Sequence, residues 1–454
     1  MTRNSLFGAA SVAALVCAAA GAMANAPVAK STIYGGGSTL AQFDYIDEFA
    51  SYAAASTAKQ ATFSTYWESG SSTGQQAFLN DDLTCDIDKV TGAHSSACVG
   101  GSGVGAAGNT VDYGASDATL NSTQIATWAT SSFGQSYAGN LIQLPAMGVG
   151  ISFPIVDAGV TSNGQVKLTD NDLCGIFSGL ITDFSQITDT GAAPAAGVFK
   201  VAYRSDGSGT SFLLTNHLNK VCNSSNTAAG ISFTATTNFA SLFSNIAAQF
   251  PNAVGKSGSS GIANYISGYS SGAVPAAIAY ISPDFTTVDP SSDATLTNAA
   301  GQSVKSTLVV ASVLKGKTAY LPTTTNIALG LAHPVSGSAL TPPSTAAQGA
   351  VPGNWVPLIQ TVSTGYPVVG YTTYDFAQCY SDTTVKTGVL AFLKGHYQLS
   401  GPYATIQRNN GFVGISHSGA SKFLGAIKGA ILANTKGWNT NIGNATVCPT
   451  VHGR

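Results

Sequence analysis

The sequence predicts an α/β fold with mostly parallel sheets flanked by helices. Two observations lead to this fold class. Strand-like runs, small polar turns and helix-like runs follow one another repeatedly, which is typical of parallel sheets. The chain has 454 residues, too many for one ordinary hydrophobic core, so we expect two domains. In such sheets ligands bind beyond the carboxyl ends of the strands, which is where the polar turns fall.

Three early strand-like runs each end in a turn of small and polar residues. These turns are residues 35–39, 68–74 and 114–118, with the sequences GGGST, ESGSSTG and GASDA. The first two lead into apolar residues at helical spacing, from Leu40 to Tyr52 and from Gln75 to Leu79. The third carries an acid, Asp117. A glycine-rich stretch at 81–109 interrupts the pattern, and we interpret it as a surface loop of unassigned role.

The later part of the chain predicts a second domain and a return to the first. Residues 141–155 are apolar and nearly uncharged, as in a buried strand that leads into a second domain. Residues 283–365 are rich in Pro, Ser, Thr and Ala, and apart from a strand-like run at 306–310 we interpret much of this stretch as irregular. Another buried strand is expected at 367–371. Helices are expected at 385–397 and 420–434.

Residues 203–212, with the sequence YRSDGSGTSF, predict an anion site. Gly207 and Gly209 allow a tight turn with exposed N–H groups, and the apolar spacing that follows predicts the start of a helix. Backbone amides and the positive end of the helix dipole favour a tetrahedral oxyanion, and Arg204 adds charge-assisted hydrogen bonds. The other polar side chains of the stretch include Asp206, Ser208 and Thr210. An ordinary surface turn with an exposed ion pair is the alternative interpretation.

Composition points to an exported protein. Charged residues make up 9% of the chain, against roughly 25% in ordinary soluble proteins, and the net charge is −2. No basic footprint for nucleic acid is present. Residues 1–24 have the features of a secretory signal peptide: a positive charge near the start, an apolar run, and small residues at the expected cleavage site after Ala24. No later run reaches the ~18 apolar residues that span a bilayer, so we expect a soluble periplasmic or secreted protein.

The cysteines predict disulfides. The chain has 7 cysteines including Cys17 in the signal, and the even number that remains is typical of bridges in an exported protein. Six cysteines allow fifteen pairings, so the sequence leaves the connectivity open. Pairing in sequence order keeps each bridge within one candidate domain. We therefore favour Cys85 with Cys98, Cys174 with Cys222, and Cys379 with Cys448.

Neither a metal site nor a nucleotide site is predicted. The sequence has no Cys-x-x-Cys motif, and its 6 histidines are scattered without ligand spacing, which favours surface or structural roles. Residues 254–257, with the sequence VGKS, look like the end of a P-loop. The first glycine which that motif requires would fall at Phe250, so we reject it.

Four polar turns in a fixed order resemble the ligand-binding turns of a known family. The residues that carry the resemblance are 35–40, 70–72, 114–117 and 204–210, with further similar stretches at 173–179, 280–285 and 378–380. The chain is similar to the phosphate-binding proteins of the Pst-type ABC transporter, and more closely to their DING-protein branch. The similarity runs over nearly the whole mature sequence.

The resemblance implies a two-lobed periplasmic-binding-protein fold with two hinge crossovers that closes on inorganic phosphate. Lobe I is expected at 25–147 and 366–454. Lobe II is expected at 148–365, with an irregular insertion at about 286–365. The two crossing strands are expected near 144–148 and 366–370.

The family's ligand residues map onto this chain one by one. The implied phosphate-binding set is Thr39, Leu40 through its amide, Ser71, Asp117, Arg204, Ser208, Gly209 through its amide, and Thr210. Asp206 would pair with Arg204. The resemblance implies a monomer with no cofactor, no catalytic residue and no metal, and the membrane permease of a phosphate ABC transporter is the candidate partner.

The chain departs from the DING branch in three places, one of which is the central motif at 204–210, closer here to the transporter form. Its opening residues 32–35 read TIYG in place of Asp-Ile-Asn-Gly, and the loop that carries Cys85 and Cys98 is extra. The ligand turns are intact. These departures therefore bear on the export route and the partners more than on phosphate binding.

Asp117 predicts discrimination between anions. A carboxylate beside a dianion is repulsive unless the anion has a proton to donate, and monohydrogen phosphate has one whereas sulfate has none. The alternative is that Asp117 merely caps the following turn.

The leading functional prediction is a solute-binding protein, not an enzyme, that captures HPO4 2− for ABC-transporter uptake or extracellular scavenging. One alternative is a secreted phosphoesterase with alkaline phosphatase-like activity, with Ser71, Ser208 or Thr210 as the attacking hydroxyl. The sequence positions no histidine or metal cluster to activate these hydroxyls. Another alternative is an adhesive or matrix protein.

Overall fold

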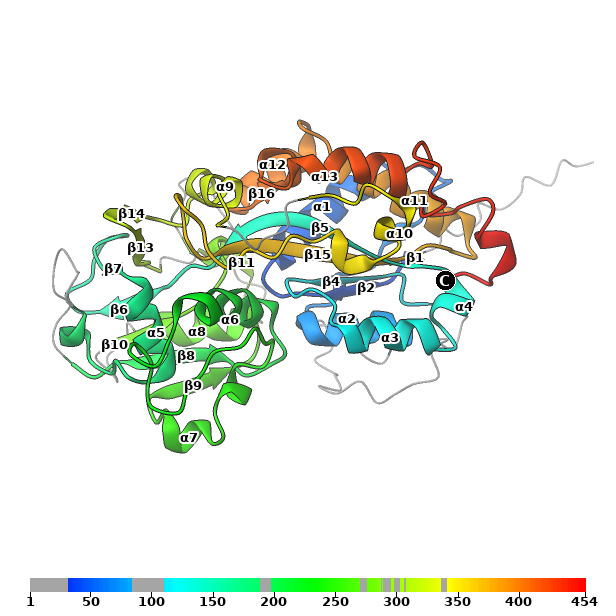
Figure 1. Ribbon diagram of the computed structural model, residues 1–454. Coiled ribbons are helices and arrows are strands. Elements are labelled where there is room, and N and C mark those ends of the chain that lie inside the picture. Colours follow the sequence, from blue (N-terminus) through cyan, green and yellow to red (C-terminus); the bar gives the residue numbers. More distant parts are fainter. Residues whose placement is uncertain are drawn as a thin grey trace, which may run out of the picture.

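The protein has two lobes, each built on a β-sheet with helices packed around it (Figure 1). A computed structural model describes residues 32–83, 110–187, 197–269, 276–286, 288, 295–297, 303–305, 308–335 and 341–454. In Figure 1 the first lobe lies to the right and the second to the lower left. The predicted two-lobed α/β fold is confirmed.

Lobe I is organised around a five-stranded sheet with the order β16-β5-β15-β4-β2. Its strands are β2 (Gly35–Gly37), β4 (Tyr113–Ser116), β5 (Leu141–Gly150), β15 (Val369–Ala377) and β16 (Val413–Gly414). Beside it, β1 (Thr32–Ile33) pairs in parallel with β3 (Thr62–Phe63). The helices of this part are α1 (Gln42–Ala55), α2 (Ser71–Asn80), α3 (Ser122–Thr130), α4 (Gln135–Ala138), α10 (Ala346–Gly349), α11 (Thr383–His396), α12 (Pro402–Asn409) and α13 (Ser421–Ala426).

Lobe II contains a four-stranded sheet with the order β6-β10-β8-β9. Its strands are β6 (Ile155–Asp157), β8 (Lys200–Arg204), β9 (Ala253–Lys256) and β10 (Ala276–Ala279), and its helices are α5 (Asp170–Ser178), α6 (Gly209–Val221), α7 (Ile246–Gln249) and α8 (Gly258–Tyr269). A smaller sheet joins β7 (Lys167–Leu168), β13 (Ser312–Lys315) and β14 (Thr318–Tyr320). A separate pair is β11 (Thr295–Thr297) with β12 (Ser303–Lys305).

The lobes are joined by the paired strands β5 and β15. The two run antiparallel, from Leu141 opposite Ala377 to Gly150 opposite Val369. Beyond this pair, the chain after β5 forms isolated bridges in lobe II, from Ser152 to Ile281 and from Pro154 to Val310. The expected crossing strands therefore coincide with β5 and with the approach to β15.

The sheets are mixed, where the sequence suggested mostly parallel pairing. Strands β2 and β4 are parallel, as are β8 with β9 and β8 with β10. However, β15 is antiparallel to both of its neighbours, β4 and β5. The reason is topological, because β5 leaves lobe I and β15 returns to it, so the two strands run in opposite directions.

The stretch at 286–365 is less irregular than the sequence suggested. Strands β13 and β14 form a hairpin across a two-residue turn, in which Gly316 has φ +62°. Helix α9 (Thr324–Ala332) then packs against β5, where a Cβ at Gly148 would lie 2.2 Å from Leu331 Cδ1. Part of the expected insertion thus covers the crossing strands. Of the strand-like run at 306–310, Val310 bridges to Pro154, while 306 and 307 lie outside the described residues.

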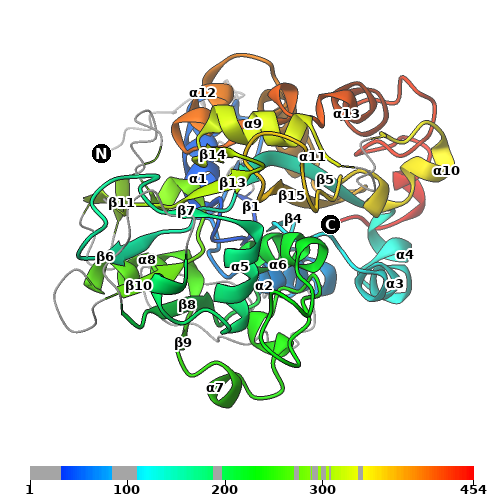
Figure 2. The same cartoon turned by 60° about the vertical axis from the view of Figure 1, so that its left-hand side comes forward.

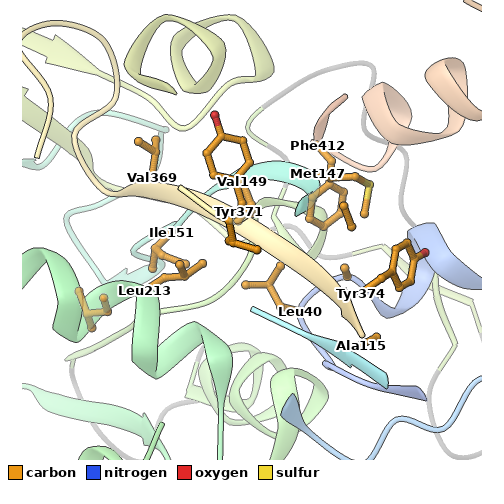
Figure 3. Packing of buried hydrophobic residues seen from close by; sticks show 14 of the residues in the cluster. Leu40, Ala115, Met147, Val149, Ile151, Leu213, Val369, Tyr371, Tyr374 and Phe412 are labelled. Atoms are coloured by element: carbon orange, nitrogen blue, oxygen red, sulfur yellow. The ribbon is translucent and has the colours of Figure 1, made fainter. Parts of the chain in front are cut away.

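The hydrophobic core is continuous between the lobes. Figure 3 shows buried residues of β5, β15 and α6 gathered around the crossing strands, together with Leu40 from the turn before α1. The fit is close, since a Cβ at Gly370 of β15 would lie 2.5 Å from Leu213 Cδ2 of α6. Such packing couples the N-terminal half of α6 to the strands that join the lobes.

Two disulfides link distant positions within the described residues. Cys174 of α5 is bonded to Cys222 at the end of α6, and Cys379 is bonded to Cys448. Both agree with the pairing favoured from sequence order. The third expected bridge, Cys85 with Cys98, lies outside the described residues, as does the expected signal peptide. Within the described part of the chain, no helix has the length and apolar character to cross a membrane.

A buried ion pair generates the first testable prediction. Arg454 Nη1 lies 3.1 Å from Asp81 Oδ1, with both side chains 0% exposed, and the guanidinium also packs over the rings of Phe78 and Trp128. We expect Arg454→Ala to lower the free energy of unfolding by about 3–5 kcal/mol, because it leaves Asp81 as an unpaired buried charge. Urea unfolding measures the change. The double variant Arg454→Met with Asp81→Asn should recover most of the loss, and an equal loss in both variants would contradict this explanation.

Candidate functional site

The predicted ligand residues gather where strand ends and helix starts of the two lobes meet. Lobe I contributes the turn after β2, the start of α2 and the end of β4. Lobe II contributes the end of β8 and the starts of α6 and α8. Figures 1 and 2 show α2 and α6 next to each other across the boundary between the lobes. Helix N-termini present unpaired N–H groups and a positive dipole end, so this arrangement favours an anion.

Asp117 lies at the centre of the lobe I half. Its side chain is 2% exposed. Ser38 Oγ donates to Asp117 Oδ1 at 2.7 Å and to Oδ2 at 2.8 Å, and Ser71 Oγ donates to Oδ2 at 3.2 Å. Burial raises the pKa of Asp117 to about 6, against the opposing effects of the Ser38 hydrogen bond, the Arg204 charge and the Ser71 hydrogen bond. Asp117 is therefore mostly ionised at neutral pH.

Arg204 is the cation of the lobe II half. It is 2% exposed and is held by both oxygens of Asp206, with a distance of 2.7 Å from Nε to Oδ1. Its Nη1 donates to Thr210 Oγ1 at 3.3 Å and to Ser259 Oγ at 3.2 Å. Asp206 also accepts the N–H of Gly258 at 2.9 Å. Although burial raises the pKa of Asp206, the Arg204 charge and these hydrogen bonds outweigh burial and lower it.

The start of α6 faces Asp117 closely. Ser208 caps the helix, with its Oγ accepting the N–H of Ser211 at 3.3 Å, and Gly209 begins the helix. A Cβ on Gly209 would lie 2.5 Å from Asp117 Oδ2 and 2.6 Å from Ser71 Oγ. Glycine is therefore required at 209 because Asp117 and Ser71 lie too close for a side chain, and not because the backbone has a positive φ there.

Several contacts hold the lobes against each other. Thr39 Oγ1 accepts the N–H of Ser259 at 3.1 Å, and their hydroxyls are also 3.1 Å apart. On the other side, the N–H of Ser72 donates to the carbonyl of Gly207 at 3.0 Å, and Ser72 Oγ donates to Thr237 Oγ1 at 3.0 Å. The lobes are therefore in a closed arrangement in this structure.

All eight predicted ligand residues fall in this one region, although some of their polar groups already have partners. The N–H of Leu40 donates to Ser38 Oγ at 3.1 Å, and Ser208 Oγ is used by its own helix. Asp206 pairs with Arg204 as expected. What the region offers chemically is one guanidinium paired with the carboxylate of Asp206, a second carboxylate on Asp117, several hydroxyls and helix-start amides. In the described ranges, no group of three or more His, Cys, Asp or Glu residues could hold a metal ion.

Two residues of this network were missed by sequence reasoning. Ser38 contacts Asp117, and Ser259 connects Thr39 with Arg204. Ser38 stands inside the first glycine turn, next to Thr39. Ser259 follows β9 and comes shortly after residues 254–257, the stretch rejected as the end of a P-loop. A strand, glycines, hydroxyls and a helix start occur here in the same order as in the other turns. That order was the signal available for Ser259.

The fold and this site define a two-lobed binding protein with its ligand residues between the lobes. The model of the PBP superfamily domain matches residues 24–337. The chain belongs to this superfamily, and within it to the group that contains the DING and phosphate-binding proteins.

Similar proteins cover nearly the whole chain. It is 32% identical to alkaline phosphatase L of Pseudomonas aeruginosa, over 99% of this chain and 98% of that protein. It is 29% identical to a phosphate-binding protein from an unknown prokaryotic organism, over 92% of this chain and 98% of that protein. These two names describe different activities.

Solved structures agree with the fold. The crystal structure of a DING protein matches with a TM-score of 0.70 and 28% identity, covering 93% of this chain and 99% of that one. A high-affinity periplasmic phosphate-binding protein, PfluDING, solved with bound phosphate, matches with a TM-score of 0.68 and 28% identity over 93% of this chain and 99% of that one.

The close approach of Gly209 generates the second prediction. We expect Gly209→Ala to prevent closure, because the added methyl group would overlap Asp117 and Ser71. Small-angle X-ray scattering with a saturating tetrahedral oxyanion such as phosphate should give a larger radius of gyration for this variant than for the parent protein. Gly353→Ala is the matched control, since a Cβ there meets nothing within 4 Å. Parent-like scattering from Gly209→Ala would show that closure tolerates the methyl group.

Proposed function

We propose that this protein captures inorganic phosphate, as monohydrogen phosphate, between its two lobes. The observation that carries the proposal is the convergence of a buried guanidinium, a buried carboxylate and three helix starts at the boundary between the lobes. This combination suits a tetrahedral oxyanion that is both an acceptor and a donor of hydrogen bonds. The names of the relatives support the same ligand.

In this proposal each group has a role. Arg204, held in plane by Asp206, donates two parallel hydrogen bonds to phosphate oxygens. Thr39, Ser71, Ser208 and Thr210 donate hydroxyl hydrogen bonds, and the amides of Leu40 and Gly209 donate from the turns. Groups that are bonded to each other in this structure, such as Leu40 to Ser38, would exchange those bonds for bonds to the anion. No cofactor is required, because capture involves no covalent step.

Asp117 is the proposed source of specificity. Above its pKa of about 6 it is ionised and can only accept hydrogen bonds. Monohydrogen phosphate offers it an O–H, whereas sulfate would leave two negative groups facing each other without a proton between them. A site that is left with an unpaired buried acceptor rejects the wrong ligand by orders of magnitude.

The wider role proposed here is phosphate uptake or scavenging outside the cytoplasm. The expected signal peptide at 1–24, the two disulfides and a relative described as periplasmic support export. We further propose a monomer that delivers phosphate to the permease of an ABC transporter, which is what the resemblance to Pst-type phosphate-binding proteins implies; one relative is named phosphate-binding protein PstS. We also propose that lobe I comprises residues 25–147 and 366–454, together with the short helix α10 that packs on it, and that the rest of 148–365 forms lobe II.

The third prediction tests the proposed function directly. In calorimetric titrations near neutral pH, the phosphate-stripped protein should bind phosphate tightly and sulfate at least 100-fold more weakly, on the order expected when a buried polar partner is lost. Asp117→Asn should bring the two affinities closer together, because the amide can donate to either anion. Arg204→Ala should weaken both. If the parent protein binds neither anion, the proposed function is wrong.

A phosphoesterase remains the second candidate because of the relative named alkaline phosphatase L. Of the three candidate hydroxyls, that of Ser71 contacts a carboxylate that could activate it, with Oγ 3.2 Å from Asp117 Oδ2. Against it, the five described histidines interact elsewhere: His217 with Asp170, His333 with Leu329, His396 with Glu48, His417 with Ser416, and His452 with Tyr137.

The fourth prediction separates the two candidates. We expect the pure protein to show no turnover of p-nitrophenyl phosphate, while phosphate still binds. Turnover that co-purifies with the protein through several columns and disappears in Ser71→Ala would favour the enzyme. Turnover that survives in Ser71→Ala and in Arg204→Ala would instead identify a contaminating phosphatase.

A further inference from the structure

Ser38 links two of the proposed ligand elements. Its hydroxyl is 0% exposed and donates to both oxygens of Asp117, at 2.7 and 2.8 Å. The same hydroxyl oxygen accepts the N–H of Leu40 at 3.1 Å. The backbone of Ser38 is also fixed, because its N–H donates to the carbonyl of Ala115 at 2.9 Å and its carbonyl accepts Tyr66 Oη at 2.7 Å. Ser38 therefore has one well-defined position.

The hydrogen bonds of Ser38 favour one protonation state of Asp117. A serine hydroxyl has one proton and two acceptor lone pairs. Both oxygens of the Asp117 carboxylate can only accept and lie 2.7 and 2.8 Å from Ser38 Oγ, so the proton of Ser38 points at the carboxylate whether or not the N–H of Leu40 stays on Ser38. Hydrogen bonds donated to a carboxylate stabilise its charged form. A carboxylate has about four acceptor positions, so Ser38 and Ser71 still leave room for the O–H of a bound anion.

We propose that Ser38 is a positioning residue that keeps Asp117 ionised and oriented towards the bound anion, so that the site excludes sulfate over a wider pH range. This inference rests on the proposed phosphate-binding function. Without Ser38, Asp117 takes up a proton at a higher pH. It then becomes an O–H donor and can accommodate sulfate as well as phosphate.

The other ionisable groups around Asp117 do not replace Ser38. Arg204 faces it from lobe II, but both carboxylate oxygens of Asp206 already pair with that guanidinium. Asp284, Tyr45 and Tyr66 are fully buried groups whose pKa values are raised first by burial and further by the charge of Asp117. Among the influences that oppose the raised pKa of Asp117, the Ser38 hydrogen bond is the largest.

The fifth prediction concerns Ser38→Ala and the pH dependence of sulfate binding. Sulfate and phosphate affinities are measured by calorimetry between about pH 5 and pH 9, the range around a raised carboxyl pKa. In the parent protein, sulfate affinity should rise as the pH falls through the pKa of Asp117. In Ser38→Ala the midpoint of this rise should move upward by about one pH unit or more, since a hydrogen bond to a charged group is lost. Phosphate should still bind at the alkaline end.

Three further variants make the test specific. Ser178→Ala is the matched control, because Ser178 is also 0% exposed and its hydroxyl also donates one hydrogen bond and accepts a backbone N–H, but in lobe II at α5. Ser38→Thr, which keeps the hydroxyl, should restore the parent midpoint. In an Asp117→Asn background, Ser38→Ala should have no effect on the pH profile, because the group through which it acts is gone.

The outcomes separate this inference from the proposed function. An unchanged midpoint in Ser38→Ala, with phosphate binding intact, would overturn the role of Ser38 and leave phosphate binding standing. If the parent protein binds neither anion, the proposed function fails. In that case the effect of Ser38 on the pKa of Asp117 can still be measured, by a carbon-13 NMR titration of the Asp117 carboxyl in the anion-free protein. A titration midpoint that does not move upward in Ser38→Ala would overturn the role of Ser38.

Discussion

The structure depends on burying a carboxylate and a guanidinium at the same boundary without letting them neutralise each other. Asp117 and Arg204 are each 2% exposed, yet Arg204 is paired with Asp206 and Asp117 is bonded to serines. If Asp117 paired directly with Arg204, each would satisfy the other's hydrogen-bonding groups, and neither would be left to bind a ligand. Keeping them apart leaves a buried acceptor and a buried donor whose best common partner is an anion with one proton.

This separation is possible because the two groups come from different lobes, which are joined by the antiparallel pair β5 and β15. Strands β5 and β15 fix the lobes at one end, and small residues permit close contact elsewhere. Gly370 makes room for Leu213 of α6, and Gly209 at the start of the same helix makes room for Asp117. Helix α6 is therefore in contact with the crossing strands through Leu213 in its N-terminal half and with the site at its first residue, which couples the hinge to the ligand groups.

The helices and turns of the site could be predicted from local sequence, whereas strand directions and long-range side-chain contacts could not. Helical spacing after each glycine turn correctly predicts α1, α2 and α6, because periodicity and turn residues act within a few positions. Strand direction in the mixed sheets depends on where the chain returns after crossing between lobes, which no local pattern records. The partners of Ser38 and Ser259 were missed for the same reason, since Thr39 and Ser259 are 220 positions apart. The composition at 286–365 suggested an irregular insertion, but the packing of α9 on β5 stabilises a helix there.

The charges of the site explain why it is built mainly from hydroxyls and amides. Arg204 is balanced by Asp206, and Asp117 adds a further negative charge, so the site carries no net positive charge with which to attract a dianion. Binding must then come from directed dipoles, namely the starts of α2, α6 and α8 and the hydroxyls beside them. Directed hydrogen bonds distinguish shape and proton position, whereas a surplus of positive charge would attract any dianion. A chain with only 9% charged residues is suited to this form of recognition, because selectivity depends on which oxygen carries the proton.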